Sequence, residues 1–94
     1  MHNIDVNSQL IQEHVSVIKV LAHPIRFSIA LLLHRNGKMN VGAIQEGLDL
    51  PQSTVSQHIS KMREAGIIKA DRQGTKIFYT LANDIAVKVL TTLS

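Results

Sequence analysis

The sequence predicts a small α+β domain that is mainly α-helical and carries a single β-hairpin. Apolar residues recur at helical spacing in four segments before residue 66 and in one segment after residue 83. Between them the period changes to alternation in two short segments joined by a glycine-containing turn. The expected order of elements is α-α-α-α-β-β-α, in a single domain over residues 1–94.

The first helix is expected over residues 7–22. Its apolar positions form two adjacent rows: Leu10, His14, Val17 and Leu21, and Ile11, Val15 and Ile18. A face of this width exceeds what the core of one small domain requires of a terminal helix. It therefore predicts packing against a second copy of the chain.

Three further helices follow. Pro24 suits the first turn of a helix that continues to about His34, and Gly37 suits its end. Met39 and Asn40 are expected to be at most a short extended segment. Residues 41–48 and 52–65 have helical spacing, and Gly66 marks the end of the second of these helices.

The remaining elements are a hairpin and a last helix. Residues 67–71 and 75–81 alternate and are expected to be strands joined by residues 72–74. Residues 83–93 return to helical spacing, with Ile85, Val89, Leu90 and Leu93 apolar. The terminal helices, residues 7–22 and 83–93, are expected to form a dimer interface.

Positive charge is concentrated in one part of the chain. The net charge is +3, and residues 51–80 contain five Lys or Arg side chains against two acidic ones, whereas the flanking segments balance. A polyanion-binding surface requires such clustering, although a mildly basic solvated face has the same composition.

Two short helices with a tight turn, followed by a basic hairpin, are typical of a winged helix-turn-helix. The first two turns of the helix at 52–65 carry amides, hydroxyls and an imidazole but no carboxylate, and such groups can hydrogen-bond base edges and phosphates. The candidate DNA-binding residues on this helix are Gln52, Ser53, Thr54, Ser56, Gln57 and His58, followed by Lys61 and Arg63 for the DNA backbone. A solvated helix rich in Gln and Ser is the alternative.

The hairpin tip is the second candidate DNA-binding element. It is small, basic and polar, and comprises Arg72, Gln73, Gly74, Thr75 and Lys76. A basic tip of this kind can lie along or in the minor groove. An ordinary exposed hairpin with charged edges has the same composition.

Four segments resemble the ArsR/SmtB family of bacterial repressors. They are residues 22–26 (AHPIR), 50–59 (LPQSTVSQHI), 66–68 (GII) and 72–74 (RQG), and the resemblance extends from about Leu10 to Leu93. Within the family, the chain is similar to the small members without cysteine. It departs from many relatives at the start of the helix at 52–65, where Pro51 replaces a serine cap.

The resemblance implies a symmetric homodimer bound to an imperfect inverted repeat in double-stranded DNA. Base-reading positions would be Gln52, Ser53, Ser56 and Gln57, and residues 72–75 would form the wing. The predicted dimer-interface residues are Leu10, Ile11, His14, Val17, Ile18, Ile85, Val89 and Leu93.

The usual sensor residues of the family are missing, so we expect no metal site and no cofactor. The chain has no cysteine, and Asp84 is the only possible ligand in the last helix. The spacing of the five histidines matches no local metal motif. His14 is expected to be a packed or hydrogen-bonded interface residue, although a site shared by His2 and His14 across a dimer is conceivable.

Three functional hypotheses follow, and no effector can be named. The first is a repressor without a built-in metal or thiol sensor. The second is a repressor that senses a metal or small molecule at the dimer interface. The third is a winged-helix protein-interaction module that has lost DNA binding. An enzyme is not expected, because no nucleophile–base or carboxylate pair stands in a recognisable setting.

No apolar run approaches the roughly 18–20 residues of a membrane span, and residues 1–5 do not resemble a signal peptide. We therefore expect a bacterial cytoplasmic protein, associated with the nucleoid when bound to DNA.

Overall fold

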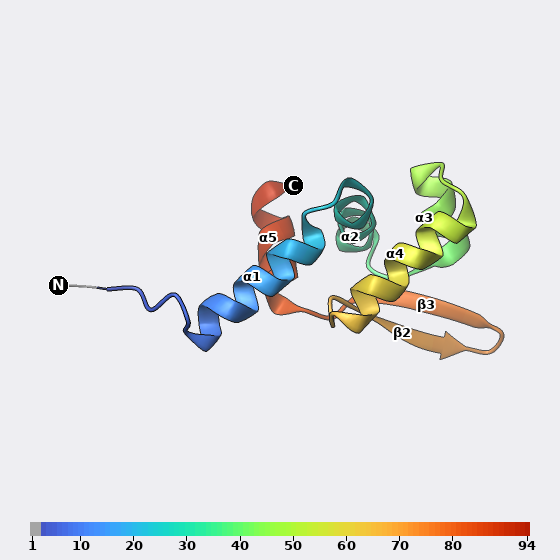
Figure 1. Cartoon of the computed structure of the whole chain (residues 1–94). Coiled ribbons are helices and arrows are strands. Elements are labelled where there is room, and N and C mark those ends of the chain that lie inside the picture. The colour runs from blue at the N-terminus through green and yellow to red at the C-terminus, as the bar shows by residue number, and fades with distance from the viewer. Residues whose placement is uncertain (1–2) are drawn as a thin grey trace.

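The computed structural model describes residues 3–94 and confirms the predicted α+β class (Figure 1). The elements in chain order are α1 (Gln9–Leu21), α2 (Pro24–Asn36), β1 (Met39–Asn40), α3 (Val41–Leu48), α4 (Gln52–Glu64), β2 (Ile68–Gln73), β3 (Lys76–Leu81) and α5 (Asp84–Leu93). The one element absent from the predicted order is β1.

Side-chain caps set the starts of four helices. The side chains of Ser8, His23, Asn40 and Asn83 accept hydrogen bonds from main-chain N–H groups in the first turns of α1, α2, α3 and α5. Such caps satisfy donors that have no partner inside the helix. They explain why α1 begins at residue 9 and α5 at residue 84, rather than at residues 7 and 83.

The end of α2 lies two residues beyond the predicted one. Asn36 still belongs to the helix, and the chain turns only at Gly37, whose φ of 83° is open to glycine but strained for other residues.

The sheet has three antiparallel strands in the order β1-β3-β2. Met39 pairs with Tyr79 and Asn40 with Phe78, so the segment expected to be at most extended is a paired strand. The β2–β3 hairpin closes through a two-residue turn in which Gly74 has φ of 64°, typical of a type II′ turn.

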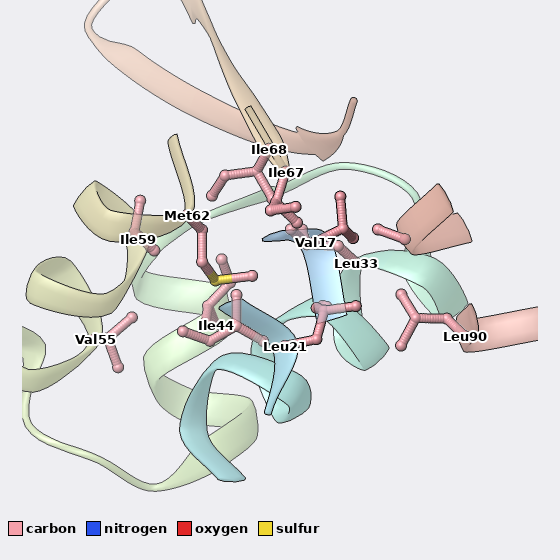
Figure 2. Packing of buried hydrophobic residues seen from close by; sticks show 13 residues of the cluster. Val17, Leu21, Leu33, Ile44, Val55, Ile59, Met62, Ile67, Ile68 and Leu90 are labelled. Carbon is pink, nitrogen blue, oxygen red and sulfur yellow. The ribbon is translucent and has the colours of Figure 1, made fainter. Parts of the chain in front are cut away.

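The core lies between the helices and the inner face of the sheet (Figure 2). It is built from aliphatic side chains and methionine, in agreement with an aromatic content of only 3%. Its members are Val17, Leu21, Ile29, Ala30, Leu33, Ile44, Val55, Ile59, Met62, Ile67, Ile68, Ala86 and Leu90. Val17 therefore belongs to the core of the protomer, and its placement on the dimer surface was wrong, because that side of α1 faces the rest of its own chain.

The molecule is elongated, with extents of 55 × 25 × 21 Å. Its Cα radius of gyration is 14.5 Å, against about 12 Å expected for a compact domain of this length. Figure 1 shows α1 and α5 together at one end and the β2–β3 hairpin extending from the other. Because Val17 and Leu21 are the only fully buried residues of α1, its N-terminal half projects beyond the core.

Across residues 3–94, no single helix is long and apolar enough to cross a bilayer. Only α1 and α2 taken together reach the required length, and they are bent by 100° at the break between them.

Candidate nucleic-acid interface

Helix α4 is buried on one side and polar on the other. Val55, Ile59 and Met62 enter the core, and the opposite side exposes Ser53, Gln57 and Ser60 at successive turns. Ser60 is not among the predicted site residues, although it continues the four- and three-residue spacing of Ser53 and Gln57.

The other predicted residues of the first two turns border this exposed face. Gln52 is exposed at the first helical position, and Ser56 and Thr54 are half-buried on the two flanks. The first turn of α4 contains no acidic residue. Neutral donors and acceptors therefore occupy the solvent side of the helix start.

The start of α4 differs from those of the other four helices. Pro51 occupies the N-cap position and makes no side-chain cap hydrogen bond. The N–H groups of the first turn have no partner inside a helix, so those of Ser53 and Thr54 are left open to an external acceptor. The positive end of the helix dipole lies at the same place.

His58 is half-buried at the edge of the outer face, and one of its ring nitrogens is buried. Its ring lies against His23, with the ring centroids 4.5 Å apart, and its Nδ1 is buried without a hydrogen-bond partner among the described residues. Burial lowers the pKa of His58, and the nearby His23, Arg26 and Lys61 lower it further.

Two cations flank the last turns of α4. Lys61 and Arg63 are both exposed, and Glu64 follows at the end of the helix. A groove of about 570 Å³ separates this end of α4 from β2, lined by Ser60, Arg63, Glu64, Ile68, Lys69 and Ala70. The structure thus adds the exposed Lys69 to the cations near α4.

All five predicted wing residues are exposed. The true tip is the pair Gly74 and Thr75 alone, because Arg72 and Gln73 belong to β2 and Lys76 to β3. The predicted loop of residues 72–74 was therefore too long, since the two-residue turn lets the ladder continue to the pairing of Gln73 with Lys76.

The outer side of the sheet carries further charge. Lys38 Nζ lies 5.2 Å from the centroid of the Phe78 ring, a cation–π contact that holds this lysine beside the wing. Gln73 Nε2 donates to Asp71 Oδ2 at 3.2 Å, so one carboxylate also lies near the wing. The sequence alone did not reveal that Lys38 lies beside the hairpin.

The opposite end of the molecule is apolar and is left partly uncovered by the rest of residues 3–94. Leu10, Ile18 and Leu93 are 65%, 50% and 66% exposed, and Val15 is also exposed. The predicted residues Ile11, Ile85 and Val89 are half-buried at the same end. We call Leu10, Ile11, Val15, Ile18, Ile85, Val89 and Leu93 together the apolar end.

His14 lies within the apolar end and is hydrogen-bonded, as expected. Its Nδ1 donates to the carbonyl oxygen of Leu10 at 2.7 Å. With Leu10, Ile11 and Val15 it lines a shallow groove of about 290 Å³.

No three His, Asp or Glu side chains come together as possible metal ligands anywhere in residues 3–94. His2, the other member of the conceivable cross-dimer site, lies outside the described residues.

Comparison with known proteins places this geometry in a family. Residues 21–70 match the model of a helix-turn-helix domain. The chain is 40% identical over 82 residues to the transcriptional repressor PagR of Bacillus anthracis, covering 87% of this chain and 80% of that protein. The crystal structure of PagR superposes with a TM-score of 0.84 at 36% identity, over 90% of this chain and 97% of the other.

Two further relatives are also named repressors. A biofilm growth-associated repressor of Agrobacterium fabrum is 40% identical over 77 residues, covering 82% of this chain and 65% of that protein. The repressor SmtB of Mycobacterium tuberculosis is 34% identical over 67 residues, covering 71% of this chain and 49% of that protein. The helix-turn-helix match and the identity to these relatives show that the chain belongs to the ArsR/SmtB family of winged helix-turn-helix transcriptional regulators.

Proposed function

We propose that this chain is a homodimeric transcriptional repressor that binds an imperfect inverted repeat in double-stranded DNA, with α4 in the major groove. The observation that carries the proposal is the outer side of α4, where polar, carboxylate-free turns follow a helix start with open main-chain donors. The similarity to proteins that are named repressors supports repression rather than activation of transcription.

In this proposal the first two turns of α4 read the bases. The amides of Gln52 and Gln57 suit adenine, and the hydroxyls of Ser53 and Ser56 can adapt to several base edges. Thr54 and Ser60 flank them. The open N–H groups at the helix start bind a phosphate and fix the helix along the groove.

The charged residues bind the DNA backbone. Lys61 and Arg63 follow the reading turns on α4, and residues 72–76 reach the adjacent minor groove from the tip of the wing. These contacts carry no sequence information by themselves, and they make the affinity depend on salt.

The apolar end forms the dimer interface. Burying its exposed leucine and isoleucine side chains against a two-fold related copy removes apolar surface from water, which stabilises the dimer. A two-fold pair then presents two α4 helices to half-sites about one helical turn apart. Because cysteine is absent from these 94 residues, the proposal includes no thiol or thiolate–metal sensor.

Selection of bound duplexes from a random pool tests the proposal. We expect an enriched inverted repeat whose two half-sites are separated by the distance between the two α4 helices of the dimer. If no duplex is preferred over competitor DNA at moderate salt, the proposal fails, and the chain would instead be an interaction module with a repressor's fold.

A pair of serine-to-alanine variants then tests whether the first two turns of α4 read the bases. Ser56→Ala should weaken binding to the selected duplex by about 1–3 kcal/mol, roughly 5- to 150-fold, and leave binding to a random duplex unchanged. Gln52→Ala should behave in the same way. Ser16→Ala, an exposed serine on α1, is the control and should change neither affinity.

A further inference from the structure

A pair of histidines joins the corner between α1 and α2 to the flank of α4. His23 is the N-cap residue of α2, and His58 lies in the second turn of α4. Their ring centroids are 4.5 Å apart and their planes are inclined by 44°. The proposed reading of DNA uses neither ring, so this contact needs its own explanation.

The cap that His23 makes requires one particular nitrogen to be unprotonated. His23 Nδ1 accepts the hydrogen bond of the Ile25 N–H at 3.1 Å. A proton on Nδ1 would replace the accepting lone pair with a donor. His23 can therefore become doubly protonated only by losing the cap of α2.

His58 is equally unsuited to carry a second proton. Its Nδ1 is buried with no partner among the described residues, so in the doubly protonated ring this N–H would have no acceptor.

The charges around His58 also oppose its protonation. They come from His23 at the corner once that ring carries a proton, from Arg26 on α2 and from Lys61 on α4. The described parts of α3 and β2 also pack against α4, but they supply none of the charged groups that act on His58. No carboxylate therefore compensates an imidazolium at this position.

Arg26 is held in place at this corner. Its Nε donates to the carbonyl oxygen of Val20 near the end of α1, at 2.6 Å. The guanidinium therefore cannot leave the corner without losing this hydrogen bond. Movement of His58, which belongs to α4, relieves the repulsion without breaking this hydrogen bond.

We propose that the neutral His23–His58 pair is a proton-sensitive contact that positions α4 on the α1–α2 corner. Uptake of a proton by the pair separates α4 from the corner and lowers the preference for operator DNA. His58 is thus a positioning residue that acts through His23. This inference rests on the proposed function for its consequence on DNA, but the contact itself does not depend on it.

The expected sign distinguishes this device from simple attraction of imidazolium to phosphate. Protonated histidines near DNA would strengthen binding to every duplex as the pH falls. Separation of α4 from the corner would instead lower the affinity for the specific duplex relative to a random one. If the arrangement in which the two rings are in contact excludes one proton on His58, the ratio of specific to random affinity falls by up to about tenfold per pH unit below the pKa of His58.

The first experiment uses the free protein and no DNA. Ring ¹⁵N spectra and the main-chain amide signal of Ile25 are followed between about pH 5 and about pH 8. We expect His58 to titrate below its ordinary value of 6.5, and the Ile25 amide to shift in step with the pair. Titration of His58 at or above that value, with no coupled change at Ile25, would overturn the proposal.

The second experiment measures fluorescence anisotropy at constant ionic strength, with the duplex selected by the protein and with a random duplex. We expect the ratio of the two affinities to fall from about pH 7.5 to about pH 5.5 in the unmodified protein. The fall should vanish in His58→Gln and in His23→Asn, in which asparagine keeps a cap but cannot titrate. His34→Gln, outside the pair, should retain it.

A constant ratio in the unmodified protein, or an unchanged fall in both pair variants, would overturn the proposal. If one variant fails to fold, the other still provides the comparison. The absence of any preferred duplex at about pH 7.5 would overturn the proposed function instead, and the Ile25 titration would then decide on the histidine contact alone.

Discussion

Replacing Ile18 with alanine should weaken the proposed dimer while leaving the protomer folded. Ile18 lies on the side of α1 away from the core, and its side chain is 50% exposed. Its neighbour Val17 is 5% exposed and belongs to the core. A change at Ile18 should therefore act mainly on dimer association, whereas a change at Val17 should act on folding.

The expected magnitude follows from that exposed fraction. Full burial of an isoleucine side chain contributes about 1.5–3 kcal/mol, so covering the exposed half of Ile18 contributes about 0.8–1.5 kcal/mol per protomer. The two-fold axis doubles the effect to about 1.5–3 kcal/mol per dimer, which corresponds to a dissociation constant about 10- to 150-fold higher.

Sedimentation equilibrium over a range of concentrations measures this change. Ser16→Ala, on the opposite and exposed side of α1, should leave the dissociation constant unaltered. Urea denaturation of the monomer form should show Ile18→Ala destabilised by no more than about 0.8–1.5 kcal/mol, the contribution of the half of the side chain that its own chain covers. An unchanged dimer constant in Ile18→Ala would show that the apolar end does not face a second copy.

Three further predictions concern the wing, the helix ends and the core. Arg72→Ala should weaken all duplexes alike and reduce the slope of log affinity against log salt by about one unit; an unaltered slope would remove Arg72 from the phosphate contacts. Gly37→Ala should destabilise the fold by at least about 1–2 kcal/mol, because φ is 83° although an added Cβ meets nothing within 4 Å. In contrast, Gly42→Ala in α3 should stabilise it by about 0.5–1 kcal/mol, and urea melts that rank the two alike would refute the conformational argument. Leu90→Ala, at a fully buried position, should cost about 2–5 kcal/mol of unfolding free energy, and a loss below 1 kcal/mol would contradict its place in the core.

The regular elements could be predicted because their signals are local. Helical spacing, Pro24 and the glycines after α2 and α4 each act through the residues next to them, and the observed helices agree to within two residues. The short strand β1 has no such signal. Two residues cannot establish an alternating period, and the pairing of Asn40 with Phe78 joins segments far apart in the chain.

The candidate site was predictable in its residue types and less so in its orientations. Helical spacing could have identified Ser60, which lies on the same side as Ser53. The ring of His58 contacts that of His23, thirty-five positions earlier, and a pattern within one helix carries no information about that contact. Val17 was misplaced for a related reason, because a broad apolar stripe does not reveal which edge faces the protomer's own core.

At the uncapped start of α4, the main-chain N–H donors do not depend on the side chains that are candidates for contacting bases. Main-chain amides have no side-chain identity, so no substitution at Gln52, Ser53 or Thr54, short of proline, can delete them. Under the proposed function, the side chains that would contact bases can therefore be exchanged, which changes the preferred DNA sequence, while the main-chain donors proposed to bind a phosphate persist. Pro51 contributes no side-chain acceptor of its own, so these donors stay open to an external acceptor.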